Sequence, residues 1–442
     1  MAFKKSPEEY RVIFLFYAMP KINLTKNQIV MLAIGAAMLL GLIILFMTGG
    51  KNPAPVAVNL TVWGVDDESV FTTALSGYVG PASVRYKKIP EDSYRATLLD
   101  ALAAGEGPDV FMVRGEDLYK YRNKTVPAPT STISAAVMDS NFPTAVIQEY
   151  TDMNGQAWGL PLSLDTLALF YNKDALEQAG IVFPPANWED FQADVRILAK
   201  RNANNQLVSP AAGIGGTLST VPIGTDVLMA LMMQNGTTMN SKDGLEATFA
   251  KSSEGLKAFN YYLQFANPSS PYYTWNENLG SAPSLFAGGR LPLYFGYRED
   301  YLKLKAAAPY LAIKVAPMPQ AGEYAVNYPR TWGLAVSKQS KAPSYAWDFV
   351  IQMAGGTNGP RAYMAASGRP PAIKFLMNEK KGDLDLGVFA LQGLTARAWR
   401  QPDGDAVRTI LSDAISNVLS GARDAQRALS EAEGSINALY KR

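Results

Sequence analysis

Two apolar segments are followed at once by side chains that could bind a polar ligand. Trp63 and Asp66 lie at the end of the segment NLTVWGVDD, and Arg114 and Glu116 follow the segment GPDVFMV. In sheets of alternating strands and helices, ligands bind beyond the carboxyl ends of the strands. There, carboxylates and guanidinium groups hydrogen-bond to hydroxyls, and an indole packs against an apolar face. The alternatives are core packing for Trp63 and a solvated or helix-capping role for Asp66.

A single carboxylate, Asp165, interrupts the apolar stretch PLSLDTLALFYN. The stretch alternates like a strand, and its leucines indicate burial on both faces. A carboxylate in a buried strand is costly unless it is paired or opens onto a polar cleft. We therefore expect Asp165 to face a ligand cleft, with a structural aspartate that caps a nearby turn as the alternative. A short helix from Asp174 to Gly180 and a longer helix capped by Asn187 should follow.

The composition excludes several classes of site. The chain contains no cysteine and no histidine, so disulfides, thiol catalysis, a lipid-modified cysteine, histidine-based zinc sites and Ser-His triads are all excluded. We expect no metal and no cofactor. The net charge is +2, which gives no reason to expect nucleic acid. Motifs for a nucleophile elbow, a phosphate loop or a dinucleotide site are absent. A glycoside hydrolase that pairs Asp165 with Asp66 or Glu116 stays as an alternative.

The elements that carry these residues alternate along the chain. Short apolar strands and helices follow one another in the order β-α-β-α from Asn59 onward, and the helical spacing of residues 94–103 ends at a glycine. Such alternation favours an α/β fold with a mainly parallel sheet. With 442 residues and 48% hydrophobic content, the chain has material for two or three structural units.

The N-terminal segment predicts a membrane anchor. Residues 29–47 carry no charge and would span about 28 Å as a helix, close to the hydrocarbon thickness of a bilayer. Five lysines or arginines precede this run and one lysine follows it closely, which places the N-terminus in the cytoplasm. We predict a cytoplasmic segment (1–26), a single-pass anchor (27–48) in the cell membrane and a linker (49–58), with the binding domain extracytoplasmic. A cleaved signal peptide is the alternative.

Six motifs in order resemble one known family. The motifs are PLSLDTLALFYNKD at 161–174, SLFAGGRLPLYFGY at 284–297, VAPMPQ at 315–320, TWGLAVSKQSKAPSYAWDFV at 331–350, SGRPPA at 367–372 and the C-terminal helices at 405–439. Together they are similar to the family-one extracellular solute-binding proteins of bacterial ABC importers, the group that includes maltose-binding protein. Two departures are the missing lipid-bearing cysteine and Pro292, which stands where the family often has alanine.

The resemblance implies a two-lobed periplasmic-binding-protein fold of type II, with hinge-linked lobes and the ligand between them. It places lobe 1 at 59–161 plus 318–366 and lobe 2 at 162–317 plus 367–442. It implies a non-enzymatic, monomeric receptor that delivers a small polar solute to an ABC permease. A carbohydrate is favoured because a sugar ring has one apolar face and a rim of hydroxyls. Peptides, polyols, polyamines and sugar phosphates remain alternatives, and so does a sensor for a membrane signalling partner.

The resemblance and the strand ends together predict the ligand contacts. Asp165 matches an acid that contacts sugar hydroxyls in maltose-binding protein, and it lies just past a hinge. For the aromatic candidates, core packing is the alternative, while Trp188 and Trp347 show core spacing and are expected to be structural. The predicted ligand-binding residues are Trp63, Asp66, Arg114, Glu116, Asp165, Trp275, Tyr297, Arg298, Trp332, Arg369 and Trp399.

Overall fold

The computed structural model describes residues 25–28, 30–31, 33–36, 38, 58–204 and 206–441. The chain divides into two units, residues 1–57 and 58–442, which are treated separately. In the first unit the described residues from Lys26 to Met38 are helical. Among the residues described, none forms a helix long and apolar enough to cross a membrane. The predicted anchor at 27–48 lies largely outside the described residues, as do most of segment 1–26 and linker 49–58, so these three predictions stay predictions.

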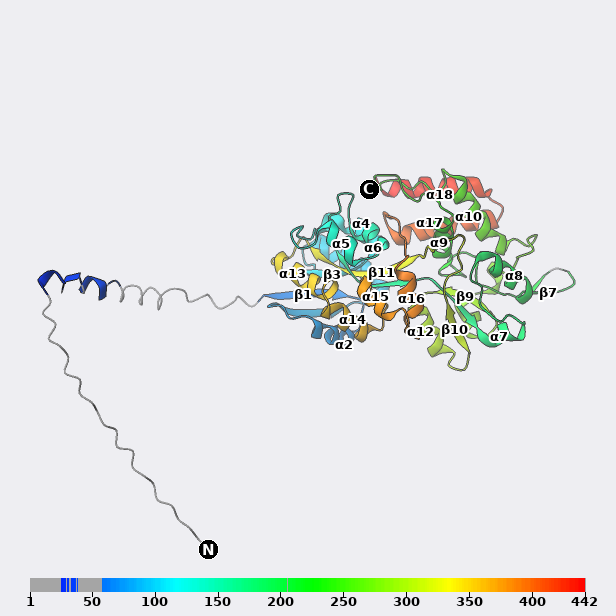
Figure 1. The fold of residues 1–442 in the computed structure, drawn as a ribbon. Helices are drawn as coiled ribbons and strands as arrows, with labels where there is room; N and C mark the ends of the chain where they lie inside the picture. The colour runs from blue at the N-terminus through cyan, green and yellow to red at the C-terminus, as the bar shows by residue number, and fades with distance from the viewer. Residues whose placement is uncertain are drawn as a thin grey trace, which may run out of the picture. The chain divides into compact units, whose positions relative to one another are not determined.

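The second unit contains two lobes, each with its own sheet (Figure 1). In the first lobe the strand order is β2-β1-β3-β11-β4, and β5 pairs with β11. Strands β1, β2 and β3 are parallel, as the β-α-β-α alternation predicts, whereas β11 runs antiparallel to β3 and β5. The strands are β1 (Asn59–Gly64), β2 (Ser83–Lys88), β3 (Val110–Arg114), β4 (Thr125–Val126), β5 (Leu160–Thr166) and β11 (Pro329–Ser337).

Helices cover this sheet and bury its apolar side chains in one core. Strand β3 is buried along its apolar length, and the helix that follows β2 buries Tyr94, Leu98 and Leu102 at helical spacing against it. The helices of this part are α2 (Glu68–Ala74), η1 (Leu75–Gly77), α3 (Glu91–Ala104), α4 (Gly115–Tyr121), η2 (Arg122–Lys124), α5 (Ala135–Asn141), α6 (Thr144–Tyr150), α13 (Pro343–Val350), η5 (Ile351–Gly355), α14 (Asn358–Ser367), α15 (Lys374–Lys380) and α16 (Gly387–Gly393).

The second lobe is built around a sheet of order β10-β6-β9, in which both pairings are antiparallel. The expectation of a mainly parallel sheet rests on the start of the chain and does not extend to this lobe. The remaining strands are β6 (Ala168–Asn172), β7 (Lys200–Arg201), β8 (Leu207–Ser209), β9 (Leu293–Gly296) and β10 (Ile313–Ala316). The helices are α7 (Lys173–Gln178), α8 (Trp188–Leu198), α9 (Gly224–Gln234), α10 (Ser253–Leu263), η3 (Gln264–Ala266), η4 (Glu277–Leu279), α11 (Ala282–Ala287), α12 (Arg298–Ala307), α17 (Gly404–Leu419) and α18 (Ala425–Leu439).

Local capping explains where the first helices of this lobe begin. The side chain of Asn172 accepts hydrogen bonds from the first turn of α7, so that Asn172 is the cap rather than the predicted Asp174. Asn187 caps α8 as predicted. As in other N-caps, the side chain of Asn172 accepts from backbone N–H groups two and three residues later. Asn172 is also the last residue of β6, so no loop separates β6 from α7.

The chain crosses between the lobes at the end of β5. Leu164 belongs to the core of the first lobe and Leu167 to the core of the second. Gln392 fastens this crossing, because its Nε2 donates to Thr166 Oγ1 and to the Leu167 carbonyl, each at 3.0 Å. Its Oε1 accepts a hydrogen bond of 2.8 Å from Met318 N, on a second crossing segment. One side chain thus holds two of the connections between the lobes.

The two cores also show how the chain is shared between the lobes. Residues 367–398 are assigned to lobe 2 from the sequence, but buried side chains of this segment, including Ala372 and Leu376, pack in the core of the first lobe. The two cores draw all their buried side chains from Leu60 to Ile436. We therefore expect residues 58–442 to fold without the preceding segment.

Candidate functional site

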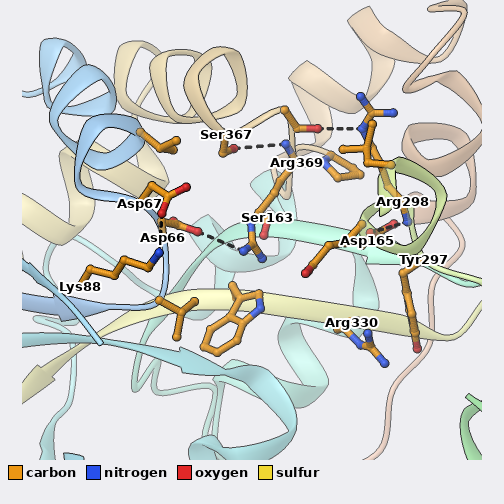
Figure 2. A pocket seen from close by; sticks show the side chains of 17 residues that line it. Asp66, Asp67, Lys88, Ser163, Asp165, Tyr297, Arg298, Arg330, Ser367 and Arg369 are labelled. Carbon is orange, nitrogen blue, oxygen red and sulfur yellow. Dashed lines mark hydrogen bonds and ion pairs between the residues drawn. The ribbon is translucent and has the colours of Figure 1, made fainter. Parts of the chain in front are cut away.

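A cavity of about 280 Å³ lies where the end of β1, the end of β5 and the start of α12 meet (Figure 2). It takes side chains from both lobes, and we call it the Asp165 cavity. Its lining is Val65, Asp66, Asp67, Val70, Lys88, Ser163, Asp165, Tyr297, Arg298, Glu299, Leu302, Arg330, Trp332, Ser367, Gly368, Arg369 and Pro370.

Asp165 is held in the cavity by backbone donors. Its Oδ1 accepts a hydrogen bond from its neighbour Thr166 N, and its Oδ2 accepts one from Arg298 N, both at 2.8 Å. Burial raises the pKa of Asp165 to about 7, against the lowering effect of these two hydrogen bonds and of the Arg330 charge. Each carboxylate oxygen can accept a further hydrogen bond, so Asp165 can receive two ligand hydroxyls.

Asp66 forms the opposite wall of the cavity with a cation from a distant segment. Its Oδ1 lies 3.0 Å from Arg369 Nη2, and its Oδ2 accepts a hydrogen bond of 2.7 Å from Tyr363 OH. Figure 2 shows this pair facing Asp165 across the cavity, with the ion pair of Asp67 and Lys88 beside it. Ser367 Oγ accepts from Arg369 N at 3.2 Å, which fixes the loop that carries the arginine.

Arg330 is positioned by Tyr297 and a buried acid from α9. Its guanidinium carbon lies 3.7 Å from the centre of the Tyr297 ring, and its Nη2 lies 3.2 Å from Asp226 Oδ2. Tyr297 OH donates to the same Asp226 oxygen at 2.8 Å. Because Arg330 covers one face of the ring and the phenol is already bonded to Asp226, we assign Tyr297 the role of positioning Arg330.

Trp332 stands between the Asp165 cavity and a second cavity of about 240 Å³, the Arg114 cavity. Arg114 and Arg369 lie 5.2 Å and 6.0 Å from the centre of its ring. The register of β11 against β5 shifts between Trp332 and Gly333. A Cβ at Gly333 would meet the Leu160 carbonyl oxygen at 2.5 Å, so this strand approach requires glycine.

The charges that line the Asp165 cavity are balanced and individually engaged. Four carboxylates face four cations: Asp66, Asp67, Asp165 and Glu299 against Lys88, Arg298, Arg330 and Arg369. The guanidinium group of Arg298 is hydrogen-bonded to backbone carbonyls: its Nε donates to Gly368 O at 2.8 Å and its Nη1 to Asp385 O at 3.1 Å. Glu299 pairs with Lys303 at 2.7 Å. The cavity therefore offers hydrogen bonds without a surplus of charge.

A cluster of ion pairs joins the lobes next to these cavities. Arg408 Nη1, on α17, donates to both carboxylate oxygens of Glu116 at 2.8 Å. Burial alone would raise the pKa of Glu116, but Arg408 and then Arg114 lower it to about 2. Arg95 pairs with Asp117 in its own lobe and with Asp405 in the other. The N-terminus of α17 is thereby docked on the N-terminus of α4.

The structure brings six of the predicted site residues together. Asp66, Asp165, Tyr297, Arg298, Trp332 and Arg369 line the Asp165 cavity. Two others lie close by: Arg114 lines the neighbouring cavity, and Glu116 is engaged by Arg408.

Three predicted aromatic contacts lie elsewhere. Trp275 is fully buried in the core of the second lobe, and its Nε1 donates to Thr220 Oγ1 at 3.1 Å, so the expectation that it contacts a ligand is corrected. Trp399 is also buried, with its Nε1 3.3 Å from Met229 Sδ. Trp63 is half-buried outside the Asp165 cavity, and Lys87 Nζ lies 4.4 Å from its ring centre.

Sequence reasoning missed Arg330, Ser163 and Lys88. Arg330 lies two residues before Trp332 on β11 and so shares its face of the strand, a period-two signal that could have found it. Ser163 likewise lies two residues before Asp165 on β5. Lys88 is the last residue of β2, at the same carboxyl edge of the sheet as the other strand ends. That position could have identified it as a site residue.

Comparisons with known proteins agree with this geometry. The sequence pattern described as bacterial extracellular solute-binding protein matches residues 75–381. A protein of Brucella abortus (strain 2308), named only as a binding protein, is 23% identical over 428 residues, which are 92% of this chain and 98% of the relative.

Solved structures with the same fold cover the body of the chain. The cyclic α-maltosyl-1,6-maltose binding protein of Arthrobacter globiformis has a TM-score of 0.71 at 17% identity, covering 87% of this chain and 99% of its own. The sugar-binding protein of Xanthomonas citri has a TM-score of 0.70 at 17% identity, covering 87% and 98%. An ABC transporter solute-binding protein of Thermotoga lettingae, bound with α-D-tagatose, has a TM-score of 0.66 at 21% identity, covering 87% and 100%. These likenesses confirm the two-lobed α/β fold.

Proposed function

We propose that this chain, which belongs to the bacterial extracellular solute-binding protein family, captures a carbohydrate in the Asp165 cavity and delivers it to the permease of an ABC importer. The matched family consists of binding proteins, so the alternative of a glycoside hydrolase is not supported. Three similar structures are named for sugars: cyclic maltosyl-maltose, an unspecified sugar and tagatose. Those names support the proposed ligand class here.

The balanced lining of the Asp165 cavity is the observation that carries the proposal. A charged ligand would compete with the ion pairs that Lys88, Arg369 and Arg330 form at this cavity. A neutral polyhydroxyl ligand adds hydrogen bonds and leaves the ion pairs in place. Asp165 has accepting capacity left on both oxygens, and a carboxylate that accepts a hydroxyl makes a charge-assisted hydrogen bond.

The cavity also offers an apolar surface and a defined size. Trp332 is the aromatic side chain whose ring is shared with the Arg114 cavity, and it can pack against the apolar face of a sugar ring. A volume of about 280 Å³ lies near the lower end of the range of small-molecule sites. We therefore propose a ligand of one or two sugar rings.

Binding would act through the connections between the lobes. Asp165 and Trp332 lie on strands of the first lobe and Arg298 begins a helix of the second, so a ligand that touches all three favours the closed form by its differential affinity. We propose that the permease recognises this closed form. If residues 27–48 form the predicted anchor, the tether raises the local concentration of the receptor at the membrane.

A ligand screen tests the proposal. Thermal unfolding of residues 58–442 is measured with mono- and disaccharides, amino acids, peptides and polyamines. A sugar at 100 times its dissociation constant should stabilise the fold by about 2.7 kcal/mol. Calorimetric titration of any hit gives its affinity and stoichiometry. Binding of a polyamine or a peptide with no response to any sugar would refute the carbohydrate proposal.

A further inference from the structure

A groove of about 690 Å³ lies between the lobes, away from the Asp165 cavity. In Figure 1, α6 and α9 are drawn above β11, and the groove is bordered by α6 and by the chain that follows α9. We call it the α6–α9 groove. Its lining is Thr144, Ile147, Gln148, Thr151, Asp152, Met153, Gly155, Met233, Thr237, Met239, Asn240, Ser241, Lys242, Gly244, Val326, Arg397, Ala398, Trp399 and Arg400.

The groove carries a surplus of positive charge. Three cations, Lys242, Arg397 and Arg400, line it together with a single carboxylate, Asp152, which leaves a net charge of +2. Within the described part of the chain, none of the three cations forms an ion pair. Unpaired cations that share one concave surface repel each other and attract an anion.

The one carboxylate is already engaged in a local turn. Asp152 Oδ1 accepts hydrogen bonds from Asn154 N at 2.9 Å and Gln156 N at 3.1 Å. Its Oδ2 lies 3.4 Å from Trp158 Nε1. These donors are on the loop after α6, so Asp152 stabilises the turn, and it forms no ion pair with Arg397 or Arg400 within the described residues.

The two arginines present their guanidinium groups with few protein partners. Arg400 Nη2 donates to the Thr151 carbonyl at 2.8 Å, and Arg397 Nη1 donates to the adjacent Ala396 carbonyl at 3.1 Å. Burial and the nearby positive charge of Arg122 lower the pKa of Arg400, as expected for a cation beside another cation. Both side chains are partly exposed, so their remaining N–H groups are available to a ligand.

We propose that the α6–α9 groove binds a phosphate-type anion. Phosphate oxygens would offset the surplus of positive charge, and guanidinium groups bind phosphate oxygens in a bidentate geometry. Gln148 adds neutral hydrogen-bonding capacity on α6, since its Oε1 is used by Ala398 N at 2.8 Å and its amide N–H groups remain. The phosphate belongs either to a soluble phosphate ester or to the headgroup of an anionic lipid.

Titration with inorganic pyrophosphate tests the site itself. Calorimetry on residues 58–442 at low ionic strength should detect binding, and Arg397→Gln should weaken it about tenfold or more because a charge-assisted pair is lost. Lys314→Gln, an exposed β10 lysine outside the groove, removes the same charge and should change the affinity less than about twofold. Thermal unfolding checks that each variant is folded. Lys242→Gln, at an exposed position, serves as the second groove variant if Arg397→Gln does not fold.

Vesicle sedimentation identifies the source of the phosphate. Residues 58–442 are mixed with phosphatidylcholine vesicles with and without phosphatidylglycerol. Sedimentation that requires phosphatidylglycerol and falls in Arg397→Gln assigns the groove to a lipid headgroup. Pyrophosphate binding that falls in Arg397→Gln, with no such sedimentation, assigns it to a soluble phosphate ester. If wild-type protein binds neither probe, or if Lys314→Gln weakens binding as much as the groove variants do, the proposal is wrong.

Discussion

The Asp165 cavity and the α6–α9 groove both lie between the lobes, and both are lined with arginine, yet their charges are arranged differently. In the cavity, Arg330 and Arg369 each have a carboxylate partner, and cations and carboxylates are equal in number. In the groove, three cations share one carboxylate that serves a turn. An arginine that is already paired acts as a rigid hydrogen-bond donor, whereas an unpaired one acts as a charge. The same residue type therefore favours a neutral ligand in one place and an anion in the other.

Removal of the interlobe ion pair should have the largest effect. Arg408→Met leaves the buried Glu116 with Arg114, at 3.5 Å, as its remaining ion-pair partner. The free energy of unfolding should fall by about 3–5 kcal/mol, because a buried carboxylate loses the partner that bonds to both of its oxygens. Urea denaturation of residues 58–442 measures the change in free energy of unfolding. The substitution should also weaken binding at both sites.

An exposed pair in the same lobe provides the control for this variant. Arg423→Met breaks the pairing with Glu431, in which both side chains are substantially exposed, and should leave the free energy of unfolding almost unchanged. Equal losses in Arg408→Met and Arg423→Met would show that the Glu116–Arg408 pair does not hold the lobes together.

Asp165→Asn should separate the two sites most cleanly. The variant loses charge-assisted acceptance of hydroxyls, so carbohydrate affinity should fall about 10- to 100-fold. Pyrophosphate affinity should not change, because Asp165 is not part of the groove. Asp174→Asn, at an exposed position nine residues later, is the matched control and should leave both affinities intact. Loss of pyrophosphate binding in Asp165→Asn would contradict the independence of the sites.

Ionic strength should act on one site and spare the other. An increase from about 50 to about 500 mM salt shortens the Debye length severalfold and should weaken pyrophosphate binding about tenfold. Carbohydrate binding in the charge-balanced cavity should change less than about twofold. Calorimetry at the two salt concentrations measures both. A carbohydrate affinity that falls in parallel with the pyrophosphate affinity would mean that the cavity, too, selects charge.

The pH dependence of carbohydrate binding should be the smallest effect. Since the pKa of Asp165 is about 7, the carboxylate is mostly neutral at pH 6 and mostly ionised at pH 8. Carbohydrate affinity should therefore fall about three- to tenfold from pH 8 to pH 6. Asp165→Asn should abolish this dependence, and a wild-type affinity that is flat with pH would show that the ionised form is not required.

The same pKa has a consequence for stability. A carboxyl whose pKa is raised on folding favours the folded state most at low pH, and this contribution is lost as pH rises through about 7. Asp165→Asn should therefore narrow the stability difference between pH 5 and pH 8, measured by thermal unfolding without ligand.

The sequence predicted the family, the two-lobed fold and the position of Asp165 because each leaves a local trace. A lone acid in an apolar strand is visible without coordinates, and the ordered motifs around it are specific when taken together. The partners of that acid are not visible in this way. Arg298 N and Asp165 meet only because the start of α12 packs at the end of β5, a contact across 133 positions.

The failures have equally physical causes. Trp275 lies in a loop rich in aromatic residues, where no periodicity distinguishes a buried side chain from an exposed one, and the core of the second lobe covers it completely. Residues 367–398 show helical patterns that indicate which face is buried but not which of two cores receives it. Trp332 could be chosen from its place near a hinge, but the register shift beside it could not.

Trp332, at the register shift with Gly333, is an intrinsic fluorescent reporter of both cavities. Its indole lines the two cavities and lies beside the guanidinium groups of Arg114 and Arg369. Indole emission responds to nearby charge and to water, so a ligand in either cavity should shift the emission maximum of Trp332. The other six tryptophans of the chain lie outside both linings, and one of them, Trp399, lines the α6–α9 groove.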